Sequence, residues 1–341
     1  MRYVSIERVE PGHYLGKTIY SANGTVMLSA GVQLTVFMIN TLNRIGVTML
    51  YIQDAAYADI DISDMVSEET KQAVIREMNE TVEALRSGKE WKAGKIGVQI
   101  NAILEAVMSS EGVMLQLNDI RTAENQWYVH ALNVCMISTL IGANMGLNAQ
   151  QLKELAAGAL LHDIGKVGAV PWVESSGTLQ EHHTWRGFER LKSKQEFSLL
   201  TAHVALQHHE QPDGKGLPRG LSADEINSYA KIVAVANRYD NLVNPAIGAL
   251  QPQDAVEELM AMSEKELDHK VLIQFTRIIS VYPNGTAVRL STKETGVVVR
   301  QHRGLPSRPV IRIVKGSGEE FEVTEIDLAL HTTVFIEAVL T

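Results

Sequence analysis

The sequence predicts a multi-domain α+β protein, in which a central all-helical domain is flanked by a small N-terminal β-rich domain and a small C-terminal β module. Three observations predict this order. Short β-favouring runs alternate with turns up to about residue 57, helical periodicity follows from residue 67 to about 279, and β-favouring runs return after VYPNGT at 281–286. A length of 341 residues also exceeds one ordinary core. We expect domains at 1–60, 111–282 and 283–341, with a helical linker at 61–110.

The N-terminal β-rich segment contains the runs HYLGKTIY, TVMLSAG and VTMLYI, with turns at Pro11-Gly12 and Asn23-Gly24. One short helix is expected from about Thr35 to Arg44. The segment carries no phosphorylation motif or ligand motif that we recognise, so the sequence does not reveal its input.

Helical spacing begins with Val74, Met78 and Val82, behind Ser67 as a capping residue. The apolar stripe of this helix lies between charged faces, which suits either intramolecular docking or a homodimer interface. Further helices are expected near 95–109, 124–145, 149–162, 185–208, 222–239 and 252–262. The C-terminal strands are expected at AVRL, TGVVVR, PVIRIV and TTVFIEAVL.

Composition limits the partners of the chain. Hydrophobic residues make up 45% and charged residues 21%, which are globular values. The net charge of −9 argues against DNA or an anionic membrane as a partner. The longest apolar run, VCMISTLIGANMGL, is too short to span a bilayer. Cys135 is the single cysteine and no signal peptide is visible, so a cytoplasmic location is expected.

Two short segments of the helical region indicate chemistry. In LLHDIGK an apolar helix leads into His162 and Asp163 and then breaks at a glycine. A buried aspartate must be paired, so Asp163 either forms a salt bridge with Lys166 or bridges two divalent ions beside the histidines. In HHEQPDGKGLP, no turn chemistry requires the two histidines that precede the glycine-rich loop.

These segments resemble the motifs of the HD-GYP family of metal-dependent phosphohydrolases. The resemblance rests on His130, HDIGK at 162–166, HTWRG at 183–187 and HHEQPDGKGLPRGL at 208–221, and it runs from about 124 to 262. It implies a helical catalytic domain at 111–282 that opens cyclic di-GMP to linear pGpG, and in some members onward to GMP. It also implies two divalent ions, Fe or Mn.

The resemblance carries site roles onto this chain. The implied metal ligands are His130, His162, Asp163, His183, His208, His209, Asn237 and Asp240. Asp163 would bridge the ions, and Lys166 would approach the phosphate, so these two form the implied catalytic pair. The implied substrate loop contains Asp213, Gly214, Gly216, Leu217 and Pro218.

Three neighbours of these motifs receive other roles. His182 and His203 are expected to be structural rather than ligands. Glu210 would either orient a ligand histidine or cap the Asp-Gly turn that follows it.

The sequence departs from the family pattern at four places. Leu217 replaces the family tyrosine, Asn237 stands at the usual carboxylate, and Gln126 stands where members with a third metal have glutamate. The segment NPAIGALQPQ at 244–253 has no basic residue where members carry arginine and lysine.

The departures leave three functions open. The chain is expected to be a cyclic di-GMP phosphodiesterase. The alternatives are a degenerate member that senses metal or nucleotide and signals to protein partners, and a phosphohydrolase for another nucleotide.

Overall fold

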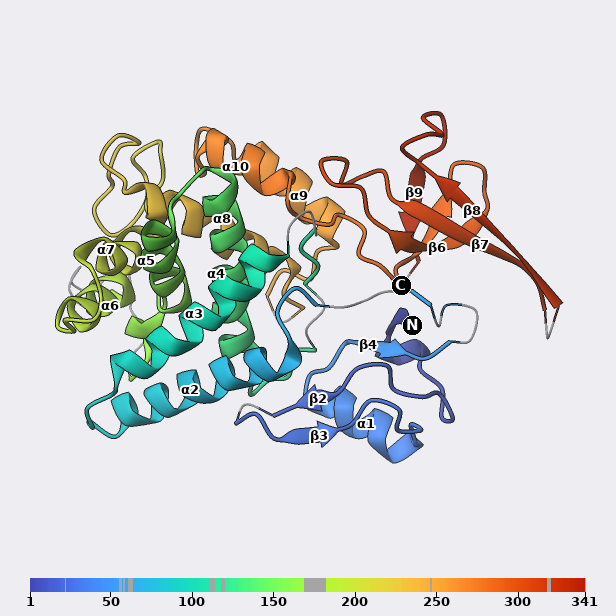
Figure 1. The fold of residues 1–341 in the computed structure, drawn as a ribbon, viewed down its shortest axis with the longest axis horizontal. Coiled ribbons are helices and arrows are strands. Elements are labelled where there is room, and N and C mark those ends of the chain that lie inside the picture. The colour runs from blue at the N-terminus through green and yellow to red at the C-terminus, as the bar shows by residue number, and fades with distance from the viewer. Residues whose placement is uncertain are drawn as a thin grey trace.

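Figure 1 shows the computed structural model, which describes residues 1–21, 23–54, 57, 59–60, 64–110, 114–117, 120–168, 182–245, 247–317 and 320–340. The helical domain occupies one end of the elongated molecule, and the two β-rich units lie together at the other. The predicted fold class is therefore confirmed. The expected domain boundaries stay a prediction, because residues 61 and 111 lie outside the described part of the chain.

The N-terminal unit is built from two small antiparallel pairs. Strand β1 (Arg2–Ser5) pairs with β4 (Met49–Ile52), and β2 (Ile19–Tyr20) pairs with β3 (Val26–Leu28). Between β2 and β3, the side-chain oxygen of Asn23 accepts a hydrogen bond from Thr25 N at 3.1 Å, as its predicted turn role requires. The 3-10 helix η1 (Ile6–Arg8) follows β1, and α1 (Val36–Arg44) begins behind Thr35, whose hydroxyl caps it.

Nine α-helices form the described part of the helical domain. They are α2 (Glu68–Arg86), α3 (Ala93–Ser109), α4 (Gln126–Asn144), α5 (Ala149–Leu160), α6 (His183–Lys192), α7 (Leu199–Gln207), α8 (Ser228–Val243), α9 (Pro252–Ala261) and α10 (His269–Thr276). The 3-10 helix η3 (Ile164–Lys166) follows α5. Helix α4 is buried on nearly every side and is the centre of the domain.

The helices of the expected linker belong to this same core. Met78 of α2 and Ile100 of α3 are buried in one cluster with residues of α4, α5 and α8. Helices α2 and α3 therefore contribute to the helical domain rather than only joining two domains.

Two helical predictions were too coarse. The single helix expected over 185–208 is two helices, because the chain turns after Lys192 and the Ser198 hydroxyl starts α7 by accepting a hydrogen bond from Thr201 N. The region 222–239 yields a later helix, α8, capped by Asn227. In addition, α10 was not predicted, because a helix of eight residues shows little apolar periodicity.

The C-terminal module is a five-stranded antiparallel sheet in the order β8-β7-β6-β5-β9. Its strands are β5 (Ala287–Leu290), β6 (Thr295–Arg300), β7 (Val310–Ser317), β8 (Glu320–Asp327) and β9 (Ile336–Val339). Strand β8 was not predicted, because its acidic sequence EFEVTEID lacks an apolar run.

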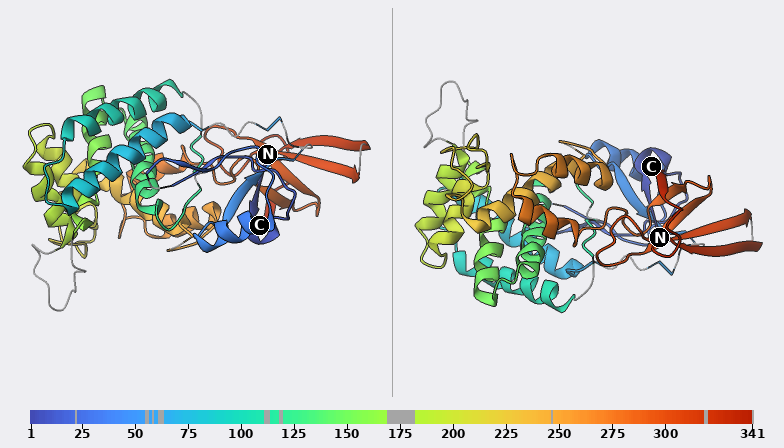
Figure 2. Two further views of the ribbon diagram at one scale, coloured as in Figure 1. Left: turned by 90° about the horizontal axis from the view of Figure 1, so that it is seen from below. Right: turned by 90° about the horizontal axis from the view of Figure 1, so that it is seen from above.

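Direct contacts hold the three units together. Arg312 of β7 donates hydrogen bonds to both carboxylate oxygens of Asp59, and Tyr3 N donates to Gly285 O at 3.1 Å. On the other side, Ala123 N donates to Ile45 O at 2.9 Å. The N-terminal unit thus contacts both the C-terminal sheet and the start of α4 (Figure 2).

Across the described ranges, no helix combines the length and the apolar character that a membrane span requires.

Candidate metal centre

Six of the predicted ligands come together from four places in the helical domain. His130 lies in α4, and His162 and Asp163 follow the end of α5. His183 is the first residue of α6, and His208 and His209 follow the last residue of α7. The site is therefore built where helices begin and end around the buried α4.

Two glycines allow these helix ends to meet. A Cβ atom on Gly165 would lie 1.8 Å from His183 O, and a Cβ atom on Gly187 would lie 3.2 Å from the Ala205 side chain. Gly165 lets η3 contact the start of α6, which brings Asp163 beside His183. Arg190 of α6 completes this corner, because its guanidinium donates to the carbonyl oxygens of Ile164 and Val167.

Asp163 lies between two sets of histidines, one at each carboxylate oxygen. Its Oδ2 lies 3.4 Å from His162 Nε2 and 4.0 Å from His130 Nε2. Its Oδ1 lies 3.4 Å from His183 Nε2 and 3.6 Å from His208 Nε2. The ligand atoms form two clusters that share this aspartate, one with His130 and His162 and one with His183, His208 and His209.

The donor atoms fit a pair of divalent cations. Asp163 Oδ1, His183 Nε2 and His208 Nε2 are buried and have no hydrogen-bond partner, yet they face one another. Buried polar atoms without partners are costly, and a cation that accepts lone pairs from all three would satisfy them. Imidazole and carboxylate ligands suit Mn, Fe and Zn alike, so the two clusters are consistent with a binuclear site without selecting the metal.

The protonation states also favour metal binding. Burial lowers the pKa of His208 to about 3 and holds the pKa of His209 well below its ordinary value, so both rings are neutral near pH 7. Burial acts to raise the pKa of Asp163, but His162, His183 and His208 outweigh it and hold that pKa well below its usual range. Neutral imidazoles and an ionised carboxylate are the forms that bind cations.

Hydrogen bonds to backbone carbonyls orient the ligand rings. His162 Nδ1 lies 2.8 Å from Ala159 O, and His208 Nδ1 lies 3.0 Å from Ala205 O. Donation from each Nδ1 leaves the Nε2 lone pair free to face Asp163.

Asp240 supports the site from the far side of His130. Its Oδ2 lies 2.7 Å from His130 Nδ1, and its Oδ1 accepts hydrogen bonds from Asn133 at 2.9 Å and from Arg121. Burial acts to raise the pKa of Asp240, but Arg121 and His130 outweigh it and lower that pKa. No local sequence signal identifies Arg121 or Asn133, because their partner lies more than 100 residues away.

The remaining two ligand predictions receive no geometric support from this arrangement. Neither Asn237 nor Asp240 belongs to either cluster among the described residues. Both oxygens of Asp240 already have partners, and Asn237 Oδ1 accepts a hydrogen bond from Asn241 at 2.9 Å. Their assignment as ligands stays a prediction, while the contacts of Asp240 are those of a positioning residue.

Lys166 lies at the mouth of the site. Its side chain is 49% exposed, and its ammonium lies 2.6 Å from Asp163 Oδ2. The salt bridge considered from the sequence is thus present, and half of the side chain still faces solvent. A cation in this position can contact the phosphate of a bound substrate.

The loop at 211–221 is fixed against the paired histidines. Leu217 N donates to His209 O at 3.0 Å, and both oxygens of the buried Glu210 carboxylate accept hydrogen bonds from the returning backbone, at Arg219 N and Leu221 N. A Cβ atom on Gly216 would lie 2.2 Å from Gln211 N, so only glycine fits there. Glu210 therefore closes the loop, a role the sequence had not resolved.

Three further residues of this region have local roles. Asp213 Oδ1 accepts a hydrogen bond from Lys215 N at 3.0 Å, which is a turn contact. His182 caps α6 by accepting from Thr184 N, and the ring of His203 packs against Phe188 with centroids 5.2 Å apart. These contacts agree with the structural roles expected for the two histidines.

Comparison with known proteins identifies the class. Residues 115–271 match the family described as "HD domain", and residues 287–341 match the "KOW domain associated with HD domain". The helical region is therefore an HD domain, and the C-terminal sheet is the module that accompanies it. With the motifs of its site, this HD domain is of the HD-GYP-like type.

Its relatives act on more than one cyclic dinucleotide. A cyclic di-GMP phosphodiesterase of Pseudomonas aeruginosa is 30% identical over 217 residues, which cover 60% of this chain and 51% of the relative. A cyclic di-GMP phosphodiesterase of Thermotoga maritima is 30% identical over 49% of this chain and 48% of its own length. A 3'3'-cGAMP-specific phosphodiesterase of Vibrio cholerae is 29% identical over 49% of this chain and 36% of its own length. The chain spans about half the length of the first two relatives, or less in the third case.

Proposed function

We propose that this protein is a metal-dependent phosphodiesterase that hydrolyses a cyclic dinucleotide, with cyclic di-GMP as the first substrate to test and pGpG, or onward GMP, as product. The observation that carries the proposal is the position of Asp163, with one set of histidines at each of its oxygens. A carboxylate shared by two ions would hold them close enough to act on one phosphodiester.

Different residues of the chain would bind the ions and the substrate. Two divalent ions, Fe or Mn, would lower the pKa of a water molecule and draw charge from the phosphoryl oxygens when bound. The candidate ligands are His130, His162, Asp163, His183, His208 and His209. Asp240 keeps His130 in the orientation that directs Nε2 into the site. Lys166 would neutralise negative charge on the phosphate from the solvent side.

The loop at 211–221 would form one wall of the substrate site. Gly214, Gly216 and Pro218 shape its backbone, and the hydrogen bond from Leu217 N to His209 O joins it to the ligands. Leu217 offers no hydroxyl where the family has tyrosine, and the segment 244–253 offers no cation. Recognition of guanine and phosphate would therefore differ from that of typical members, which makes 3'3'-cGAMP the second substrate to test.

One observation favours a degenerate binding protein. Asn237 replaces the family carboxylate, and its amide oxygen accepts a hydrogen bond from Asn241. A site with one fewer anionic ligand binds cations less tightly. In that case the chain would bind metal or nucleotide and signal through its β-rich units.

The test is turnover of each dinucleotide by protein purified without oxygen and supplied with Fe²⁺ or Mn²⁺. Formation of pGpG from cyclic di-GMP, with loss of turnover in Asp163→Ala, supports the proposal. Turnover of 3'3'-cGAMP alone changes the substrate and retains the reaction. Bound metal with no turnover of either compound contradicts the phosphodiesterase and supports the binding protein.

The variant Leu217→Tyr sharpens this test. It restores the family hydroxyl at a half-buried loop position and leaves the side chains of the candidate ligands unchanged. If substrate recognition is what limits the enzyme, KM for the preferred dinucleotide should fall while kcat stays close to that of the unchanged chain.

A further inference from the structure

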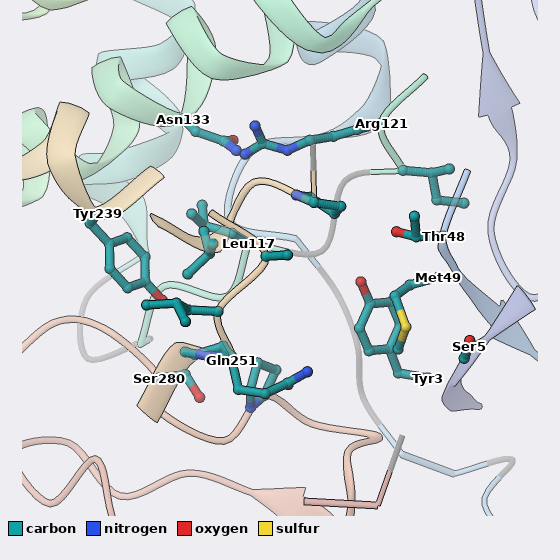
Figure 3. A pocket seen from close by; sticks show the side chains of 17 residues that line it. Tyr3, Ser5, Thr48, Met49, Leu117, Arg121, Asn133, Tyr239, Gln251 and Ser280 are labelled. Atoms are coloured by element: carbon teal, nitrogen blue, oxygen red, sulfur yellow. The ribbon is translucent and has the colours of Figure 1, made fainter. Parts of the chain in front are cut away.

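A cavity lies between the N-terminal unit and the helical domain (Figure 3). Tyr3 and Met49 line it from β1 and β4, and Asn133 and Tyr239 line it from α4 and α8. Its volume is about 340 Å³, which falls within the range of small-molecule sites. None of the predicted metal ligands in the two clusters lines it.

The walls of the cavity are mostly apolar. Side chains of Leu117, Ile120 and Leu250 contribute aliphatic surface, as do the rings of Pro245, Pro252 and Pro283. Tyr3 and Tyr239 add two planar aromatic rings. Aromatic rings in an apolar lining suit a planar molecule.

The charge of the lining restricts the ligand. Among the described residues that line the cavity, Arg121 is the single charged side chain, and no carboxylate is present. Arg121 already forms an ion pair with Asp240. A cationic ligand would be repelled by Arg121 and would meet no carboxylate in the lining, and a strongly anionic ligand would compete with Asp240 for Arg121. A neutral ligand avoids both costs.

Two buried polar atoms in the lining lack hydrogen-bond partners. Asn133 Oδ1 and Ser280 Oγ belong to side chains that are each 1% exposed, and neither atom has a partner. The amide of Asn133 is oriented by donation from its Nδ2 to Asp240 Oδ1 at 2.9 Å, so its oxygen is the free acceptor. A buried acceptor without a donor is costly, and a ligand N–H would satisfy it.

We propose that this cavity is a binding site for a neutral, planar heterocycle that donates an N–H hydrogen bond to Asn133 Oδ1. The flat apolar walls hold the ring, and the Ser280 hydroxyl can donate to or accept from a second polar group. The proposal does not rest on the phosphodiesterase activity, because binding here involves no metal and no turnover.

Two hydrogen bonds connect the lining of the cavity to the metal centre. Asn133 contacts Asp240, and Asp240 contacts His130. A ligand that donates to Asn133 would therefore lie two side chains away from a candidate metal ligand, at the contact between the N-terminal unit and the HD domain.

The experiment uses indole and N-methylindole as matched probes with the full chain. Both are neutral and planar, but only indole has an N–H donor. Ligand-observed NMR titration should give a dissociation constant on the order of 1 mM for indole, as expected of so small a molecule. N-methylindole should bind about tenfold more weakly, because it leaves the buried acceptor unpaired.

Two variants locate the binding. Thr48 lines the cavity and is exposed, so Thr48→Trp should fill the cavity and abolish indole binding without disturbing the core. Thr332→Trp, at an exposed position of the C-terminal module outside the lining, is the matched control and should bind as the unchanged chain does. Asn133→Leu should remove the preference for indole over N-methylindole.

Three results would contradict the proposed binding site. Equal affinity for the two probes, or indole binding that survives Thr48→Trp, would refute the site, as would no saturable binding of either probe. Should Asn133→Leu not fold, the comparison of Thr48→Trp with Thr332→Trp still decides. Failure of this test leaves the dinucleotide turnover assay unaffected, so the two proposals fail separately.

Discussion

The two ring nitrogens of His130 face two different polar networks. Nε2 faces His162 at 3.3 Å and Asp163 at 4.0 Å, in the site where buried atoms of Asp163, His183 and His208 lack partners. Nδ1 faces Asp240, and both oxygens of that carboxylate have hydrogen-bond donors. The first network needs a cation to be satisfied, whereas the protein alone satisfies both carboxylate oxygens of Asp240.

This difference separates residues that bind the metal from residues that position those ligands. Lone pairs that converge without hydrogen-bond donors can bind a cation, whereas a carboxylate surrounded by donors holds a neighbouring ligand in place. Changes on the Nε2 side should therefore act on metal content and activity, while changes on the Nδ1 side should act first on stability and on metal affinity.

The largest effect is expected for Asp163→Ala, which removes the residue shared by both clusters. Both metals should be lost, and phosphodiesterase activity should fall by about a thousandfold or more. Elemental analysis and a turnover assay on the same preparation measure this. His203→Gln is the control, since His203 lies outside both clusters, and it should retain metal and activity. Retention of both metals in Asp163→Ala would remove the bridging role.

Gly165→Ala should disrupt the metal centre by forcing two backbone segments apart. The new Cβ atom would lie 1.8 Å from His183 O, so η3 and α6 must separate, and we expect a loss of about 3 kcal/mol or more in the free energy of unfolding. Gly94→Ala in α3 is the matched control, because nothing lies within 4 Å of its Cβ position. The control should be neutral or stabilised by up to about 1 kcal/mol. Urea unfolding compares the two, and equal stabilities would show that the close contact is absent.

Asp240→Asn tests whether Asp240 positions His130 or binds a metal itself. Removal of the negative charge breaks the ion pair between the buried Asp240 and Arg121, which should cost about 3–5 kcal/mol of stability. Metal affinity should fall about 10–100-fold while the stoichiometry at saturation stays at two. Asp254→Asn at an exposed position of α9 is the control. Loss of one metal even at saturation would instead make Asp240 a ligand.

The smallest effect near neutral pH is expected from the pH dependence of the metal-free chain. Burial lowers the pKa of His208 from 6.5 to about 3 in the folded state, so the unfolded chain binds more protons between these values. Stability is therefore complete above about pH 6.5 and declines as pH falls toward 3, by about 1.4 kcal/mol per pH unit for this one residue. Chelator-treated protein should show the decline in urea unfolding. His208→Gln should reduce the slope, and an unchanged slope would exclude His208 as its source.

The histidine clusters were predicted because the motifs around them resemble those of the HD-GYP family, and His130 was identified by the same resemblance. HDIGK and HHE each place two of the predicted ligands side by side. The residues that hold Asp240 in place could not be predicted from local motifs. Arg121 and Asn133 reach Asp240 across 119 and 107 residues, and only the packing of α4 against α8 brings them together.

The fold shows the same limit. Helices with clear apolar periodicity, such as α2, were predicted closely, and β5, β6 and β7 followed from their branched and apolar runs. Strand β8 and helix α10 were missed because the first is acidic and the second is short. Their structure depends on neighbours rather than on local pattern.

The most direct test of the two-cluster site is the metal content of single-cluster variants, measured by native mass spectrometry after purification without oxygen. The unchanged chain should carry two metals, and His162→Gln and His183→Gln should each carry one, since each belongs to a different cluster around Asp163. Two metals retained in both variants, or both metals lost together in each, would contradict two clusters that share one aspartate.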